Sequence, residues 1–535
     1  MVCILILTIF AGERGRHDAS RLMVHNMHLY THTLNQYTMD QNTKLIPNPV
    51  ARYLGKDPGE FRKADIIRFI TEHDIRMVNF MYPADDNRLK TLNFVINSAE
   101  YLDSILTFGE RVDGSSLFPF IKAGNSDLYV IPRYSTAFVD PFAEIPTLTM
   151  LCEFFDNQGQ PLDSSPQYTL FKAAESFRRV TGMDFYAMGE LEYYVIADDT
   201  SMFEATDQRG YHESSPFAKF NDFRTECMDL IAKAGGAIKY GHSEVGNFSL
   251  DGKIYEQNEI EFLPVPALEA ANTLMVAKWI IRTLAMKRGY DVTFAPKITT
   301  GKAGSGLHIH FKIMDGDRNM MIKDGKLSDI ARKAIVGILD HAAAITAMGN
   351  KVPTSYFRLV PNQEAPTSIC WGDRNRSVLV RVPLGWTGGR DMCSQINPLE
   401  PETIVDPQRQ TVELRSADGS ANVYQLIAGI IVSARSGFEM ADALEQAERL
   451  YVSVDIHKDK EKLAMLSSLP DSCQASSEAL KNDRQVFEEY GVFSHDMIDS
   501  IIARQHDYRD KHLRENVMHN KQEMLQLVRK YWHCG

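Results

Sequence analysis

Three pairs of charged residues, each with members two positions apart, stand in apolar runs that are typical of β-strands. Side chains at positions i and i+2 of a strand share a face, so each pair directs two ionisable groups the same way. Several such strands facing one another would build a cage of carboxylates and imidazoles. Unneutralised charges at that density are costly to bury, so the cage predicts metal ions and an anionic substrate. The pairs are Glu190/Glu192, His308/His310 and Glu413/Arg415.

Each pair taken singly would more often form the solvent face of a half-buried strand than a binding site. One feature that favours a site is the glycine-rich turn GKAGSG at 301–306, which suits close backbone approach to a ligand. It is not a Walker A loop, because no Ser or Thr follows its lysine. A second feature is the supply of acids and arginines elsewhere in the chain: Glu256, Glu259, Glu261, Arg358, Glu364, Arg374, Arg376 and Arg381.

The chemistry that these residue types suit is phosphoryl transfer. Hard carboxylate oxygens with a single imidazole favour Mg²⁺ or Mn²⁺ over Zn²⁺, which prefers sulfur and nitrogen ligands. Several arginines beside such a cage suit phosphate and carboxylate groups, because the guanidinium fork matches both anions. Metals and arginines without an obvious covalent nucleophile predict an ATP-using, two-metal enzyme that acts on a carboxylated small molecule.

Composition narrows the partners and the compartment. The chain of 535 residues is 44% hydrophobic and carries 58 Lys and Arg against 70 Asp and Glu, a net charge of −12. This balance argues against general affinity for nucleic acid or an anionic membrane and favours a small molecule. Seven cysteines without a CxxC motif fit neither a disulfide framework nor a zinc site, so we expect a cytoplasmic protein. The apolar stretch 2–11 is too short to span a bilayer.

The elements that must position the charged pairs indicate an α+β protein. Residues 1–62 form an N-terminal extension, and we expect residues 1–38 to be dispensable because Met39 precedes sequence that looks more like a domain. Residues 63–160 mix helical and strand patterns and indicate a small domain. In residues 161–535, helical patterns alternate with the charged strands and predict a curved sheet backed by helices. These helical patterns cover 165–182, 220–236, 269–289, 327–349 and 424–451.

The residues assembled so far lie in motifs that resemble glutamine synthetase of the bacterial type, in a divergent subgroup with an N-terminal extension. The resemblance covers roughly residues 63–489, with the order of the motifs preserved. The motifs are DGSS (113–116), GELEYY, HSEV (242–245), QNE (257–259), GSGLHIH, RLVPNQEAP, RNRS and VELRS.

The resemblance implies a fold, an assembly and a reaction. It implies a small β-grasp domain at 63–160 and a catalytic domain at 161–535, with a curved antiparallel barrel-like sheet backed by helices and a helical C-terminal region. It implies a homo-oligomer, usually a dodecamer of two hexameric rings, with active sites between subunits. The implied reaction uses L-glutamate, ammonium and ATP, and forms glutamine through a γ-glutamyl phosphate.

The resemblance also implies a role for each matching residue. One Mg²⁺ or Mn²⁺ ion would be held by Glu192, Glu244 and Glu259, and a second, nearer the nucleotide phosphates, by Glu190, His308 and Glu413. Arg358, Arg376 and Arg415 would grip glutamate and the transferring phosphate, with backbone contact from Gly304. His310, Arg376 and Arg381 would bind ATP. Asp113 would take a proton from ammonium, Glu364 would close the site against water, and Tyr211 would help to form the ammonium pocket.

Some positions depart from the family pattern. Ala303 stands where many relatives have asparagine, and Thr411 where an arginine near the nucleotide is common. Glu259 follows Glu244 by fifteen positions, a longer excursion than usual. Tyr451 lies near the tyrosine that some relatives adenylylate, but its surroundings favour a buried helix-end residue.

Two rivals remain to the glutamine synthetase interpretation. The first is a γ-glutamyl ligase of the same family that uses an amine such as a polyamine. Retention of Asp113 favours ammonia over that rival. The second is a catalytically inactive relative with a structural or regulatory role, which retention of all six metal-ligand positions disfavours.

Overall fold

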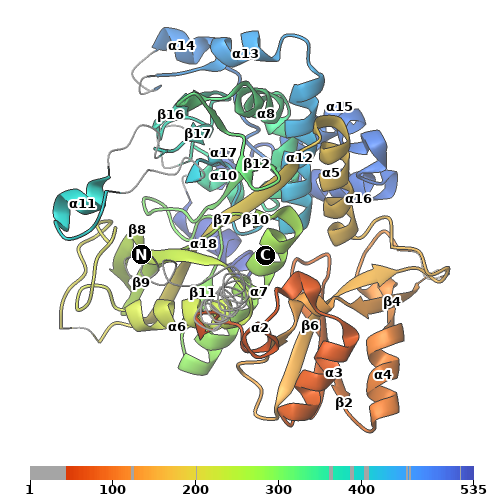
Figure 1. The fold of residues 1–535 in the computed structure, drawn as a ribbon. Coiled ribbons are helices and arrows are strands. Elements are labelled where there is room, and N and C mark those ends of the chain that lie inside the picture. Colours follow the sequence, from red (N-terminus) through yellow and green to blue (C-terminus); the bar gives the residue numbers. More distant parts are fainter. Residues whose placement is uncertain are drawn as a thin grey trace, which may run out of the picture.

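Two domains lie side by side in the computed structural model (Figure 1). The model describes residues 44–121, 124, 126–200, 202–360, 365–385, 391–402, 409–453, 456, 460–517 and 520–535. The expectations for residues 1–38 and for Glu364 therefore lie outside the described residues.

The N-terminal domain is built on a six-stranded mixed sheet in the order β2-β1-β6-β4-β3, with β5 paired to β6. Strand β1 is antiparallel to β2 and parallel to β6. The strands are β1 (Met77–Pro83), β2 (Leu89–Val95), β3 (Glu110–Asp113), β4 (Asp127–Pro132), β5 (Phe138–Val139) and β6 (Thr147–Phe155).

Helices α3 (Lys63–Glu72) and α4 (Ala99–Phe108) cover this sheet. Helix α3 places Ile66, Phe69 and Ile70 on one face, at the i, i+3, i+4 spacing of an amphipathic helix, and all three are buried. The short helix α2 (Pro49–Leu54), capped by Asn48, adds Val50 and Leu54 to the same core. The domain core thus includes residues before position 63.

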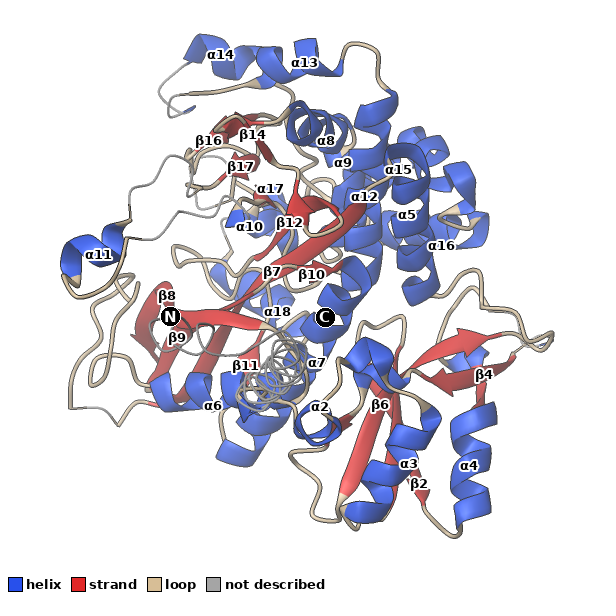
Figure 2. Cartoon of the chain, viewed as in Figure 1, coloured by secondary structure: helices blue, strands red, loops and turns tan. Residues whose placement is uncertain are grey.

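The second domain holds a ten-stranded sheet that curls into a half-barrel, in the order β16-β17-β18-β12-β7-β9-β8 (Figure 2). Neighbouring strands are antiparallel except β16 and β17, which are parallel. The main strands are β7 (Asp184–Asp198), β8 (Ile238–Leu250), β9 (Lys253–Phe262), β12 (Leu307–Asp315), β16 (Trp371–Asp373), β17 (Val380–Val382) and β18 (Val412–Leu414). Short strands β10 (Val265–Pro266) and β11 (Asp291–Thr293) pair with β7, and β13 (Arg318–Asn319) pairs with β12.

Strand β7 shows why this sheet separates a core from a site. Leu191, Tyr193 and Val195 are fully buried in the large hydrophobic core, whereas Glu190 and Glu192 alternate with them and face the other side. The i, i+2 prediction for this strand is therefore confirmed by its geometry.

Helices pack on the core side of the half-barrel (Figure 2). The most deeply buried is α12 (Val423–Glu439), which packs against α5 (Pro166–Thr181) and α8 (Asp329–Asp340). The others include α6 (Asn221–Lys233), α7 (Ala267–Arg288), α9 (Ala342–Gly349), α13 (Ala443–Leu450), α15 (Cys473–Glu488) and α16 (His495–Asp507).

Two predicted helices are each divided in the structure. The pattern at 424–451 forms α12 and α13, because the backbone turns extended at Met440 (ψ 129°). The pattern at 327–349 forms α8 and α9, which meet at His341. Helical periodicity continues through both breaks because the residues on each side bury against the same core, so periodicity alone does not locate them.

The C-terminal helix α18 (Lys521–Lys530) packs on its own chain, where Met524 and Val528 bury against Phe357. No helix among the described residues is long and apolar enough to cross a membrane. Six cysteines of the described chain are free thiols: Cys152, Cys227, Cys370, Cys393, Cys473 and Cys534.

Candidate active site

The strand register brings the charged pairs together. His308 of β12 stands opposite Glu190 of β7, and Glu192 of β7 stands opposite Glu259 of β9. On the other side of β12, His310 stands opposite Glu413 of β18. Four strands far apart in the sequence therefore present their ionisable residues at one level of the half-barrel.

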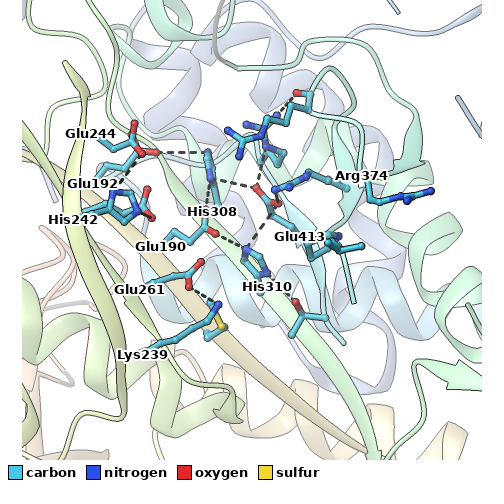
Figure 3. Close-up of a pocket in the computed structure, with 18 of the residues that line it drawn as sticks. Glu190, Glu192, Lys239, His242, Glu244, Glu261, His308, His310, Arg374 and Glu413 are labelled. Atoms are coloured by element: carbon cyan, nitrogen blue, oxygen red, sulfur yellow. Dashed lines mark hydrogen bonds and ion pairs between the residues drawn. The ribbon is translucent and has the colours of Figure 1, made fainter. Parts of the chain in front are cut away.

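These side chains line a cavity of about 1690 Å³ on the concave side of the sheet (Figure 3). Most of the residues predicted from the sequence lie on its wall: Glu190, Glu192, Tyr211, Glu244, Glu259, Gly304, His308, His310, Arg358, Arg376, Arg381, Glu413 and Arg415. The cage that the sequence predicts is thus a single cavity.

Glu190, His308 and Glu413 form a group whose ligand atoms all lie within 4.8 Å of one another. His308 Nδ1 is 2.7 Å from Glu190 Oε2 and 3.4 Å from Glu413 Oε1. Burial opposes ionisation of Glu190, but the imidazoles of His310 and His308 outweigh it and hold the pKa of this carboxyl well below its usual range. The group is the same one that the resemblance assigns to the second ion.

Two arginines share the Glu413 carboxylate, which is almost fully buried. Arg381 Nη1 donates to Glu413 Oε2 at 2.9 Å, and Arg415 Nε donates to Glu413 Oε1 at 3.0 Å. Glu413 therefore lies between the two arginines on one side and His308 on the other, and the hydrogen bonds from both arginines orient its carboxylate.

A second group consists of His242, Glu244 and Glu259, again with ligand atoms within 4.8 Å of one another. Burial and the carboxylates around it raise the pKa of Glu259 well above its usual value. Burial and the charge of Glu192 likewise raise the pKa of Glu244 to about 7. Crowded carboxylates with raised pKa values are stabilised by a cation, so this group fits a divalent ion.

Glu192 lines the cavity between the two groups, but its orientation differs from the simple prediction. Its Oε2 accepts hydrogen bonds from Gln257 Nε2 at 3.0 Å and from the Gly306 backbone N–H at 2.8 Å. Its Oε1 lies 3.9 Å from His308 Nε2. The compact group around Glu244 and Glu259 contains His242, where the prediction had Glu192.

The sequence predictions did not assign His242 or Glu261 as ligands. His242 precedes Glu244 by two positions and Glu261 follows Glu259 by two, so the same i, i+2 rule would have found both. Glu261 forms a third close group with Glu190 and His310, and its Oε2 pairs with Lys239 Nζ at 2.5 Å.

Arg358, which the resemblance assigns to the substrate, is held rigidly. Arg358 is 2% exposed, and its Nη1 donates to the carbonyls of Ser416 at 2.9 Å and Ala417 at 3.1 Å. Gly304 lies against it, since a Cβ at position 304 would stand 2.6 Å from the Pro296 carbonyl oxygen and 3.0 Å from Arg358 Cγ. A glycine is required here for close packing.

Arg376 and Tyr211 lie at exposed parts of the wall. Arg415 Nη1 donates to the Arg376 carbonyl, which fixes the backbone that carries the Arg376 guanidinium. The Tyr211 ring stacks on His212 at 4.1 Å and meets His242 edge-on at 5.4 Å. Tyr211 thus borders the His242 group, where the predicted ammonium pocket would lie.

Asp113 is not among the residues that line this cavity. It ends β3 in the N-terminal domain, is exposed, and accepts hydrogen bonds from Ser115 Oγ and Ser116 Oγ at 2.7 Å each. These hydroxyls lower the pKa of its carboxyl. The described chain therefore does not bring Asp113 to its own site.

The sequence departures have structural counterparts. Thr411 Oγ1 lies 3.0 Å from His310 Nδ1 and helps to orient that ring. The long excursion between Glu244 and Glu259 is a β-hairpin that turns between β8 and β9 at Asp251 and Gly252. Ala303 is fixed through its backbone, because its carbonyl accepts from Tyr194 Oη at 2.9 Å and its N–H donates to Gln208 Oε1 at 2.7 Å.

Tyr451 follows α13 and is partly buried, with its ring 4.9 Å from that of Trp371. The packing matches the prediction of a helix-end tyrosine, although the side chain is only partly buried.

Two family models match the two domains of the chain. Residues 74–157 match the family model "Glutamine synthetase, beta-Grasp domain", and residues 163–524 match "Glutamine synthetase, catalytic domain". The chain is 29% identical over 478 residues to glutamine synthetase of Frankia alni, covering 83% of this chain and 94% of that one. It is 26% identical to 3-hydroxylaminophenol mutase of Cupriavidus pinatubonensis, covering 82% and 94%. The cryoEM structure of Plasmodium falciparum glutamine synthetase shares the fold, with a TM-score of 0.69, 18% identity and coverage of 86% and 98%.

The two-domain fold, the cavity of acids and arginines, and these matches define an enzyme of the ligase class. The chain belongs to the glutamine synthetase family. The β-grasp domain and the half-barrel expected from the motifs are confirmed.

Proposed function

We propose that the protein ligates ammonia to the γ-carboxylate of L-glutamate at the expense of ATP, giving L-glutamine, ADP and phosphate. The observation that carries the proposal is the shared cavity: the Glu190/His308/Glu413 and His242/Glu244/Glu259 groups line the same wall as Arg358, Arg376, Arg381 and Arg415. Such a site neutralises two anions that must meet, the glutamate carboxylate and the γ-phosphate of ATP.

Two divalent cations, Mg²⁺ or Mn²⁺, suit the oxygen-rich donor set. Glu190, His308 and Glu413 would hold one of them. Glu244 and Glu259 would hold the other, together with Glu192 and His242. When bound, the ions supply positive charge that offsets the charge of the phosphates and of the attacking carboxylate.

The arginines bind and orient the reactants. Arg358, with Gly304 beside it, would hold glutamate, because its buried guanidinium is fixed by backbone carbonyls. Arg415 and Arg381 flank Glu413, so an anion near them would meet two positive charges in fixed positions. Arg376 would neutralise charge on the transferring phosphate, and His310 and Arg381 would contact ATP.

The first step joins the glutamate γ-carboxylate oxygen to the γ-phosphorus, breaks the bond to ADP and yields γ-glutamyl phosphate. Ammonia then attacks the acyl carbon and displaces phosphate. Only free ammonia has a lone pair, so a base must take a proton from ammonium, and Asp113 is the proposed base. Glu364, outside the described residues, is proposed to close the site against water.

Because Asp113 does not line the cavity of its own chain, the proposal includes a homo-oligomer in which a second copy supplies it. A dodecamer of two hexameric rings is the proposed assembly, and a cytoplasmic location stays a prediction. The function is tested by ADP release from purified protein with Mg²⁺ or Mn²⁺: release that requires both L-glutamate and ammonium supports it, and release independent of either contradicts it.

A further inference from the structure

One buried side-chain amide joins the ion site to the loop that carries Gly304. Gln257 lies on β9, is 1% exposed and is one of the residues that line the cavity. Its Nε2 donates to Glu192 Oε2 at 3.0 Å, to the Gly304 carbonyl at 2.9 Å and to Ser305 Oγ at 3.2 Å. A single NH₂ group therefore contacts both a proposed ion ligand and the proposed substrate loop.

The orientation of this amide is set by its surroundings. Gln257 Oε1 accepts the Gly246 backbone N–H at 3.1 Å. The flipped amide would place its oxygen against Glu192 Oε2 and the Gly304 carbonyl, which are both acceptors, and its NH₂ against a donor. The hydrogen-bonding pattern thus permits one orientation.

The space around the amide is equally restricted. A Cβ at Gly246 would stand 2.0 Å from Tyr194 Oη and 2.7 Å from Gln257 Oε1. Glycine at this position therefore lets the backbone of β8 approach both side chains closely. Tyr194 Oη in turn donates to the Ala303 carbonyl at 2.9 Å. Gln257 and Tyr194 therefore hold consecutive residues of the loop, Gly304 and Ala303, from strands β9 and β7.

The consequence for Glu192 is a fixed carboxylate. Its Oε2 accepts two N–H donors, from Gln257 and Gly306, and these leave Oε1 directed toward His308. A ligand that is held by an outer hydrogen-bond partner binds a metal better, because less orientational freedom is lost on binding.

We propose that Gln257 is a positioning residue that sets the Glu192 carboxylate for the ion and the 303–306 loop for the substrate, so that loss of its amide weakens both. The ion part stands on the site geometry alone. The substrate part rests on the proposed function, with L-glutamate as the ligand.

The test is Gln257→Met, which keeps the length of the side chain and removes its donors and its acceptor. In full-length protein without substrates, Mn²⁺ binding followed by electron paramagnetic resonance should weaken by about 10- to 100-fold. The KM for L-glutamate should rise by about fivefold, the loss of one neutral hydrogen bond. Unchanged Mn²⁺ affinity in a folded variant would overturn the proposal.

Asn258 provides a matched control, because it is the next buried amide on β9 and its Oδ1 accepts from Arg224 Nη1 at 2.5 Å instead of facing the cavity. Asn258→Leu should lower the melting temperature but leave Mn²⁺ affinity within about twofold of the wild type, since its side chain bonds Arg224 and Glu256, neither of which is a proposed ligand. Equal losses of affinity in both variants would show a general structural effect and overturn the proposal.

A double-mutant cycle separates positioning from packing. If Gln257 acts through Glu192, adding Gln257→Met to Glu192→Gln should change Mn²⁺ affinity by less than about twofold further. Additive losses would contradict it. If Gln257→Met does not fold, Gln257→Asn keeps an amide that is one methylene too short, and the same loss of Mn²⁺ affinity is expected. Absence of glutamine formation in the wild type would refute the proposed function, while Mn²⁺ binding would still decide the role of Gln257.

Discussion

His308 and Glu190 stand directly opposite each other on neighbouring antiparallel strands, with His308 Nδ1 2.7 Å from Glu190 Oε2. The pairing places an imidazole and a carboxylate from residues more than a hundred positions apart at the centre of the cavity. Glu190 also meets His310, whose Nε2 lies 2.8 Å from Glu190 Oε1. The Glu190 carboxylate thus contacts both members of the pair: His308, a proposed ion ligand, and His310, a proposed contact of the nucleotide.

Replacing Glu192 tests the ion site. We expect Glu192→Ala to reduce glutamine synthesis by at least about a hundredfold, because the variant loses a proposed ligand and its charge compensation. The hydrophobic cores do not contain Glu192, so the elution volume in size-exclusion chromatography should match the wild type. Near-normal turnover would contradict the assignment of Glu192 to an ion.

Mixing two inactive variants tests whether the active site is shared between subunits. We expect Asp113→Asn and Glu192→Ala to be inactive alone. Random reassembly of equal amounts should restore about one quarter of wild-type activity, the fraction of interfaces at which both wild-type residues meet. No recovery after verified subunit exchange would contradict the proposal that a second copy supplies Asp113.

Removing residues 1–38 tests the N-terminal extension. A chain that begins at Met39 keeps the helix at Pro49–Leu54 and every described residue of the N-terminal core, so we expect its kcat/KM and melting temperature to equal those of the full chain. Loss of activity in a folded truncated protein would refute dispensability.

Stability should depend on pH through Lys278, which is fully buried and donates to the Gly419 carbonyl. Burial first, and Arg282 second, lower the pKa of Lys278 to about 7, against about 10.4 in the unfolded chain. Between these values the unfolded chain binds the proton and the folded chain does not, so stability rises with pH. From pH 7 to 9.5, the melting temperature of the wild type should therefore rise relative to that of Lys278→Met. A constant difference would contradict the lowered pKa.

The sequence predicted local structure better than it predicted contacts between residues far apart in the chain. Period-two alternation correctly placed Glu190 with Glu192 on one face of β7 and His308 with His310 on one face of β12, and local periodicity located most of the helices. The strand order did not follow from local patterns, because His308 meets Glu190 and Glu413 only through pairings across long separations.

The orientation of individual side chains could not be predicted from the sequence either. Glu192 looks equivalent to Glu190 in GELEYY, yet the Gln257 amide and the Gly306 N–H occupy its Oε2, and its Oε1 is the atom that faces His308. His242 takes its place beside Glu244 and Glu259. Such choices depend on donors contributed by other strands and loops, which no local spacing reveals.

The most direct test of the account is the amide product formed from ATP, L-glutamate and a nitrogen donor. With Mg²⁺ or Mn²⁺ and ¹⁵N-labelled ammonium, the account predicts ¹⁵N in the γ-amide of L-glutamine, one ADP released per amide formed. It also predicts a kcat/KM for ammonium at least about tenfold above that for methylamine or putrescine, since Asp113 is proposed to bind and deprotonate ammonium. Preferential formation of a γ-glutamyl alkylamide, or no ATP-dependent amide from any donor, would contradict it.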